Sequence, residues 1–290
     1  KQQPMLIQPR PWQSMTGGGH LDNDLPLIRS RAGMNLDYLN ESNLSPVIRS
    51  VNYLQTQELN FDSWMIGIQK TAWDCNIRGL FPVVRDPIVA EPRPEGFLED
   101  EAYKKWREQT LLAQRDRAEG SAERRHIEQS LRDSSEVTDQ PAYFSYCADF
   151  RYRIYSSNRY ATHQGPDWEK AAISFADKEK AGDEGFAWML KAAAGHYGIR
   201  GTWEEREKWG VVHIPEMCSL VDSPLDRLEL WRGAKDPWQY LQLAKAISDY
   251  MGGELKTGVP IRLDQTCSGI GIAASLLRDR RLAKLTNITG

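Results

Sequence analysis

Apolar side chains recur at helical spacing through residues 46–79, and this pattern predicts one long helix. Pro46 suits the first turn of such a helix, because a nitrogen at that position needs no hydrogen-bond partner within the helix. The apolar positions continue from Val47 to Trp64 and beyond. Four prolines follow within residues 80–97, and they predict a linker.

Residues 98–133 predict a second helix, which carries dense charge of both signs. Basic and acidic side chains nearly cancel along it, and Gly120 is the expected point of any break. The ordinary interpretation of such a pattern is a solvated helix with ion pairs four residues apart. Two long helices joined by a proline-rich linker predict an antiparallel arm.

From residue 141 the pattern changes, and an alternating aromatic stretch at residues 143–155 predicts a strand. Residues 1–45, rich in proline and glycine, predict an irregular segment. The mixture of strands and helices indicates an α+β fold. The other predicted elements are a helix at 183–197 capped by Asp183, a helix opened by a capping box at Thr202, a helix at 236–250, a strand at 259–264 and a helix at 269–277.

The composition is that of an ordinary globular protein, and its 290 residues suggest two domains or one large one. The formal net charge of −3 gives no general support for binding a polyanion, so a nucleic-acid site must be a local basic groove. Ten Trp and eleven Tyr suit a packed core, and they also suit stacking on bases.

The four cysteines form no CxxC pair, so neither a zinc site nor a disulfide framework is indicated, and reduced thiols in a cytoplasm are expected. The five histidines show no metal-ligand spacing. No apolar run approaches the length of a membrane span, and no export signal is visible. Because the sequence starts at Lys1 and not at Met, a missing upstream segment is expected.

The most informative polar position is Asp264, which follows a predicted strand and precedes a turn of small residues and a helix. A carboxylate at the end of a strand can hold a divalent cation, and Mg²⁺ takes one or two carboxylates together with phosphate oxygens and water. The alternative is an aspartate in a surface turn without a ligand.

A second candidate is the run from Asp149 to Tyr155. If this run is one strand, alternation places Arg151, Arg153 and Tyr155 on one face. Two arginines beside an aromatic ring suit a backbone phosphate and a stacked base or sugar. The alternative is a sheet face that carries ion pairs.

These segments, in this order, resemble the single-subunit RNA polymerases of phages and mitochondria. The resemblance covers nearly the whole chain, and its strength lies in several motifs that follow one another in register. The matching segments are residues 9–12 with 16–19 (similar to the PRPW…TGGGY segment), 149–155 (the DxRGRxY strand), 164–165 (within NPQGND), 184–191 (the EG-YWLKIH helix), 223–225 and 236–241 at similar spacing, and 263–270 (motif A, DGSCSGIQH).

The resemblance implies a right-hand polymerase fold, in which a helical thumb adjoins part of a palm. Residues 1–45 would form a pre-thumb segment, residues 46–138 the thumb, and residues 139–290 the first part of the palm with motif A. The palm would have a mixed or antiparallel sheet, and a partner chain would complete that sheet across a large apolar interface.

The resemblance also assigns roles to residues. Asp264 would bind two Mg²⁺ ions, shared with the partner chain, and the backbone carbonyl of Gln265 would be a further ligand. Ser268 and Gly269 would contact the incoming nucleotide. The residues expected to contact the template or the RNA–DNA hybrid are Arg151, Arg153, Tyr155, Gln164 and Gly165.

Gly269 lies five residues after Asp264, where related DNA polymerases place a glutamate that blocks a ribose 2′-OH. A glycine there leaves room for a ribonucleotide, so ribonucleoside triphosphates are the expected substrates. The sequence departs from the family at Tyr152 and Gln265, each of which stands in place of a glycine, and at residues 271–272, which replace Gln-His. These departures suggest a divergent member.

The family also needs a second metal-binding aspartate in an HDS-type motif and a fingers helix, and neither is found in this sequence. We therefore expect a split, heterodimeric phage polymerase in which a second polypeptide supplies both parts, and a cut piece of one chain is the alternative. The expected location is the cytoplasm of an infected bacterial host. The competing functions are a non-catalytic nucleic-acid-binding or regulatory module derived from a polymerase, and a DNA-synthesising relative.

Overall fold

The computed structural model describes residues 3–22, 25–29, 43–82, 92–93, 101–149, 153–263, 267–286 and 288. The chain divides into two compact units, Lys1–Val259 and Pro260–Gly290. Helices dominate both, and short strands occur in the first, so the predicted α+β class is confirmed. None of the helices in the described ranges combines the length and apolar composition that crossing a bilayer requires.

The described strands form three small sheets, all in the first unit. In the first sheet β1 runs parallel to β4 and β4 antiparallel to β5, so this sheet is mixed, whereas the pairings in the other two are antiparallel. The strands are β1 (Ile28–Arg29), β4 (Tyr146–Asp149) and β5 (Ile154–Ser156); β3 (Pro141–Ala142), β2 (Leu59–Phe61) and β6 (Ile173–Phe175); and β7 (Glu179–Lys180) with β8 (Lys256–Thr257).

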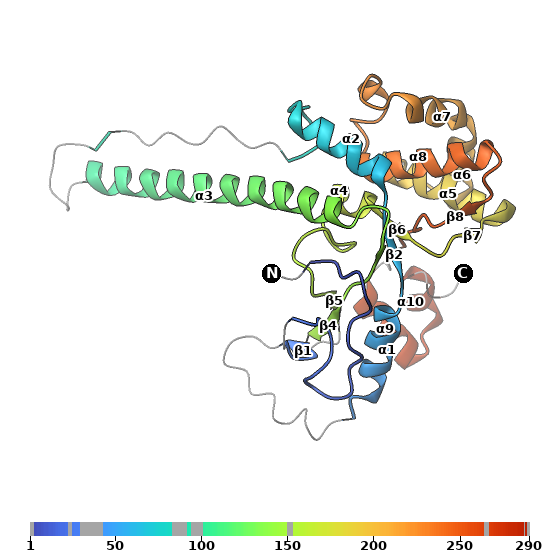
Figure 1. Cartoon of the computed structure of the whole chain (residues 1–290), viewed down its shortest axis with the longest axis horizontal. Coiled ribbons are helices and arrows are strands. Elements are labelled where there is room, and N and C mark those ends of the chain that lie inside the picture. Colours follow the sequence, from blue (N-terminus) through green and yellow to red (C-terminus); the bar gives the residue numbers. More distant parts are fainter. Residues whose placement is uncertain are drawn as a thin grey trace. The chain divides into compact units, whose positions relative to one another are not determined.

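Helices α1 to α8 belong to the first unit, and α9 and α10 belong to the second (Figure 1). The helices are α1 (Ser45–Gln55), α2 (Ser63–Asp74), α3 (Glu101–Glu136), α4 (Asp167–Ala171), α5 (Gly182–Tyr197), α6 (Trp203–Val212), α7 (Ile214–Asp222), α8 (Pro237–Met251), α9 (Ser268–Leu277) and α10 (Arg280–Leu285), with a short 3₁₀ turn at Leu228–Leu230.

The prediction of one long helix at residues 46–79 is wrong, because strand β2 separates α1 from α2. Leu59 and Phe61 point into the core, and β2 pairs with β3 on one side and β6 on the other. Asp62 then starts α2 by accepting a hydrogen bond from the Met65 amide at 2.8 Å. The helical spacing of the apolar residues therefore gives no sign of β2, the central strand of its sheet.

Helix α3 confirms the second predicted helix and continues through Gly120 without a break. Most of its buried residues lie between Ile127 and Ser134, and its N-terminal half extends beyond the other elements of the first unit (Figure 1). Helix α2 meets the C-terminal part of α3, where the Arg124 guanidinium lies 5.6 Å from the centre of the Trp73 ring. The expected two-helix arm is thus a single projecting helix, because β2 interrupts the other half.

The described part of the N-terminal segment is irregular apart from β1, in agreement with the prediction, and it is anchored by Trp12. The Trp12 side chain is buried, and its indole N–H donates to the Gln55 side chain and to the carbonyl of Tyr146, each at 3.1 Å. A Cβ on Gly18 would lie 2.5 Å from the Trp12 ring, so only glycine fits there. The PRPW and TGGG motifs therefore pack against each other.

The helical predictions for residues 183–250 are confirmed by α5, α6 and α8. Thr202 forms the predicted capping box with Glu205, and Pro237 occupies the first turn of α8. The predicted cap at Asp183 is wrong, because α5 begins one residue earlier, with Ala181 in the capping position. Helix α8 packs against α4, α5 and α7, so it forms the centre of this helical core.

Two strand predictions are also wrong. The stretch at residues 143–155 is a hairpin made of β4 and β5 and not one strand. The described residues of the predicted strand at 259–264 form no strand, and the chain pairs earlier, through β8. At this point the Phe175 amide donates to the Gly258 carbonyl at 2.8 Å, and a Cβ on Gly258 would overlap the Phe175 carbonyl.

Asp167 joins the short helix α4 to the first turn of α8. Its carboxylate accepts hydrogen bonds from the backbone amides of Trp238, at 2.7 Å, and Gln239, at 3.1 Å, and from the Gln239 side chain at 2.9 Å. Burial raises the pKa of this carboxyl above its ordinary value, although the three hydrogen bonds act in the opposite direction. Asp167 thus provides the cap of α8 from outside that helix.

Candidate functional site

The first candidate site lies on the β4–β5 hairpin. The Asp149 amide donates to the Arg153 carbonyl at 2.9 Å, and the Arg153 amide donates to the Asp149 carboxylate at 3.0 Å. Arg153 and Tyr155 are both exposed, and their spacing of two residues places them on the same side of the extended chain. Arg151 lies outside the described residues. The hairpin therefore presents a cation beside an aromatic ring, although not through the single strand that the sequence predicts.

Gln164 and Gly165, the next predicted contacts, lie in the loop before α4. The Gln164 side-chain oxygen accepts from the Ser156 amide at 2.7 Å, and its nitrogen donates to the Ile154 carbonyl at 3.0 Å. One side chain thus bonds to the backbone of β5 on both sides of Tyr155. The structure brings Arg153, Tyr155 and Gln164 together, and it gives the Gln164 amide a role in holding the strand.

Glu169, which the sequence did not single out, lies directly behind this loop. Its side chain is fully buried, with one oxygen 2.8 Å from the His126 ring and the other accepting from the Thr162 amide at 3.1 Å. A Cβ added to Gly165 would overlap the Glu169 carboxylate, so the glycine is needed for this packing. No local pattern predicts that burial, because the partners of Glu169 lie at His126 and Thr162 and not beside it in the sequence.

The second candidate site belongs to the unit Pro260–Gly290. Asp264 and Gln265 lie outside the described residues, and the description resumes at Cys267, which has a φ of 51° and leads into α9. Gly269 occupies the first turn of α9. Apart from the adjoining residues and the backbone of the helix, none of the residues that the structure describes comes within 4 Å of the position that a Cβ would take there. Of Ser268 only the backbone is described. The helix predicted at residues 269–277 is confirmed.

Carboxylate groups are scarce in this unit, and Asp264 itself lies outside the described residues. Its sequence contains two acidic residues, Asp264 and Asp279. Asp279 caps α10 by accepting hydrogen bonds from the amides of Arg281 and Leu282, at 2.9 and 3.1 Å. Among the residues that the structure describes, no three His, Cys, Asp or Glu side chains gather as a metal site. Mg²⁺ takes one or two carboxylates together with phosphate oxygens and water, so Asp264 stays a predicted ligand.

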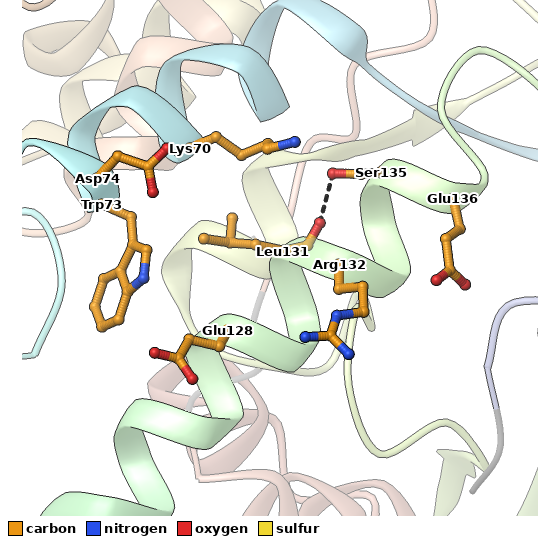
Figure 2. Close-up of a pocket in the computed structure, with 8 residues that line it drawn as sticks. All are labelled: Lys70, Trp73, Asp74, Glu128, Leu131, Arg132, Ser135 and Glu136. Carbon is orange, nitrogen blue, oxygen red and sulfur yellow. Dashed lines mark hydrogen bonds between the residues drawn. The ribbon is translucent and has the colours of Figure 1, made fainter.

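A pocket of about 450 Å³ lies between α2 and the C-terminal part of α3. Figure 2 shows Lys70, Trp73 and Asp74 of α2 facing Glu128 and Arg132 of α3 across it. Its lining carries both cations, Lys70 and Arg132, and carboxylates, among them Asp74 and Glu128. This mixture of charge does not favour a polyanion, so we place no phosphate contact there.

Comparison with known proteins gives the family relationship. The family described as DNA-dependent RNA polymerase matches residues 179–290. The mitochondrial DNA-directed RNA polymerase of Neurospora crassa is 25% identical over 98% of this chain. DNA-directed RNA polymerase 1, mitochondrial, of Arabidopsis thaliana is also 25% identical over 98% of the chain, and T7 RNA polymerase of Escherichia phage T7 is 23% identical over 99%. This chain is related to the phage- and mitochondrial-type DNA-directed RNA polymerases.

The polymerase relationship confirms the resemblance seen in the motifs. The family match includes the segment of Asp264 and Gly269, and the longer alignments also include the hairpin and α3. The chain spans 21% of the length of the Neurospora crassa enzyme, 30% of the Arabidopsis thaliana enzyme and 33% of the T7 enzyme. The relatives are enzymes several times longer than this chain.

Proposed function

We propose that this chain forms the thumb and the first part of the palm of a DNA-directed RNA polymerase. The observation that carries the proposal is the motif A segment: Asp264 lies within the family match and leads into α9, where Gly269 leaves open space. The projecting helix α3 supports the assignment of a thumb, since a long exposed helix can lie along a product duplex.

Asp264 is the proposed ligand of two Mg²⁺ ions, and the Gln265 carbonyl is a further ligand. The chemistry that such ions supply when bound is stabilisation of the attacking 3′-oxygen and of the leaving pyrophosphate. The open space at Gly269 lets a ribose 2′-OH approach the first turn of α9, and Ser268 lies beside it. The proposed reaction is template-directed transfer of ribonucleotides from their triphosphates.

The β4–β5 hairpin is the proposed contact with the template strand or the RNA–DNA hybrid. Arg151 and Arg153 supply positive charge for backbone phosphates, and Tyr155 supplies a ring for stacking. The hydrogen bonds from Gln164 hold the backbone on both sides of Tyr155, which fixes the direction of that ring. Gly165 lets the chain pass close to Glu169.

A complete site requires a second acidic ligand and a fingers element, because one carboxylate does not hold two ions. We propose that a second polypeptide carries both, with the HDS-type motif, and that it completes the palm sheet in a heterodimer. We further propose a phage polymerase that acts in the cytoplasm of the infected bacterial host; the T7 enzyme and the mitochondrial enzymes match this chain about equally well.

The native mass of the protein purified from its source, together with its activity, tests this proposal. We expect a species well above 33.1 kDa that contains a second polypeptide and extends RNA on a DNA template when Mg²⁺ is added. A single longer polypeptide with the same activity would keep the polymerase assignment and remove the split arrangement. A species of about 33.1 kDa that binds hybrid without extending RNA would instead support a non-catalytic module.

Replacing Gly269 with Glu should shift sugar selection towards deoxyribonucleotides. The added carboxylate would enter the space where the ribose 2′-OH is proposed to lie, so incorporation of ribonucleotides relative to deoxyribonucleotides should fall by about tenfold or more, or about 1.4 kcal/mol. The measurement is competitive incorporation of the two nucleotide types by the assembled polymerase. Because nothing lies within 4 Å of the added Cβ, the variant should fold normally.

The matched control for that experiment is Gly269→Ala. It adds the same Cβ in the same open position without a side chain that reaches the sugar, so selection of ribonucleotides should remain near the wild-type value. An unchanged ratio in Gly269→Glu would remove the argument for steric selection of the sugar at this position.

A further inference from the structure

The loop at residues 158–165 follows strand β5 and contacts both the projecting helix α3 and the β4–β5 hairpin. On the helix side, the Ala161 amide donates to the Ser130 hydroxyl of α3 at 3.2 Å, and Tyr160 contacts the His126 ring edge-on at 5.0 Å. On the hairpin side, the Gln164 side chain bonds to the backbone of β5. The same short loop therefore touches both elements to which we assign nucleic-acid contacts.

The Glu169 carboxylate is the polar link at the centre of this connection. One oxygen lies 2.8 Å from Nε2 of His126 on α3, and the other accepts from the Thr162 amide in the loop. The side chain is fully buried, whereas the His126 side chain keeps about a third of its surface exposed. A fully buried carboxylate oxygen that lost its hydrogen-bond partner would be left unsatisfied, which favours keeping both contacts together.

Gly165 closes the loop around this carboxylate. Its amide donates to the Thr162 carbonyl at 3.0 Å and so forms a tight turn. A Cβ at this position would overlap the Glu169 carboxylate, so the turn and the acid fit each other only with glycine. A displacement of α3 at His126 is thus transmitted through Glu169 to the turn, and from the adjacent Gln164 to β5.

We propose that Glu169 is a positioning residue that couples α3 to strand β5, so that both elements grip one nucleic acid as a unit. The ligand is an RNA–DNA hybrid, with phosphates held at the hairpin by Arg153 and the duplex lying along α3. This inference rests on the proposed polymerase function for the ligand, whereas the mechanical coupling rests on the hydrogen bonds alone.

The test compares Glu169→Gln with wild type in the assembled polymerase. Glutamine keeps the shape of glutamate but removes its charge, and its NH₂ group can donate to Nε2 of His126 only when that nitrogen carries no proton. The substitution therefore weakens the link to α3. Hydrogen exchange should become faster at the loop around Thr162 and on α3 around His126 together. Dissociation of a fluorescent RNA–DNA hybrid should become about tenfold faster.

Asp167→Asn is the matched control. Asp167 lies two residues from Glu169 on the same helix and is also a hydrogen-bonded carboxylate, but its partners Trp238 and Gln239 are on α8. A purely structural cost of disturbing α4 should affect both variants, whereas hybrid dissociation should change in Glu169→Gln alone. All comparisons are made well below the melting temperatures of both variants.

A second variant, His126→Ala, tests the same coupling independently in case Glu169→Gln does not fold. It removes the imidazole ring that contacts Glu169 and so the link from α3. The variant should still fold, because alanine suits a helix and His126 is only partly buried. It should also speed hybrid dissociation. The proposed coupling would be overturned if the hybrid dissociated at the same rate from wild type, Glu169→Gln and His126→Ala. Faster hydrogen exchange in the loop alone, without a change on α3, would also overturn it. If wild type does not bind the hybrid, the polymerase proposal fails. Hydrogen exchange at the loop and on α3, measured in the same variants, then decides alone whether the coupling exists.

Discussion

RNA synthesis by the assembled polymerase should fall by at least about a thousandfold when Asp264 is replaced with Ala. The proposed metal ligand would be lost, and a loss of ~4 kcal/mol of transition-state stabilisation corresponds to that factor. Binding of RNA–DNA hybrid should stay within about twofold of wild type, because the proposed hybrid contacts lie on the hairpin and on α3. Primer extension and equilibrium binding of a labelled hybrid measure the two effects separately.

Asp279→Asn is the control for this substitution, since it removes the other acidic charge of the same unit. Asparagine can still cap α10, where Asp279 now accepts hydrogen bonds from Arg281 and Leu282, so folding and synthesis should both be retained. Synthesis that survives in Asp264→Ala would show that the metal site has been assigned to the wrong residue. A loss of both synthesis and hybrid binding would indicate a structural role for Asp264.

The free energy of unfolding should fall by about 3–5 kcal/mol when Trp238 is replaced with Ala. The Trp238 side chain is fully buried, and its ring centre lies 5.3 Å from that of Phe81 and 5.2 Å from that of Trp231. Its indole N–H donates to the Leu80 carbonyl at 2.7 Å, so the substitution leaves a cavity and a buried acceptor without its donor. Urea denaturation monitored by circular dichroism measures this change in the free energy of unfolding.

Trp203→Ala is the matched control, because it deletes the same side chain from the surface. Trp203 is 46% exposed on α6, where its ring centre lies 5.2 Å from that of Trp188, and its removal should cost about 1–2 kcal/mol, clearly less than that of Trp238. Equal losses from the two substitutions would mean that α8 is not the centre of the helical core. The backbone amide of residue 238 still bonds to Asp167 in the variant, so the cap of α8 is kept.

The relationship to polymerases follows from the motifs in the sequence, and the motifs also pointed to the chemistry of individual residues. Asp264 stands out because it follows a predicted strand and precedes a turn of small residues, and its resemblance to motif A adds its role and that of Gly269. The family match covers that segment, while the roles of the two residues stay predictions. A short motif can be recognised from the sequence because the residues that carry the chemistry lie next to one another in the chain.

The helices from residue 183 onwards were also predictable from sequence. The capping box at Thr202 and the proline that opens α8 are local signals, since the groups that stabilise a helix end lie within a few residues of it. Even so, one cap was wrongly assigned to Asp183, because α5 starts one residue earlier than the pattern suggests.

The strands and the buried polar links were decided only by the tertiary structure. Phe61 of β2 pairs with Ile173 of β6, more than a hundred residues later, so no pattern near residue 61 distinguishes this strand from a helix. Glu169 is buried because His126 and the Thr162 amide meet it in space. Strand pairing and the burial of charge depend on partners brought together by folding, whereas helix ends and catalytic motifs depend on sequence neighbours.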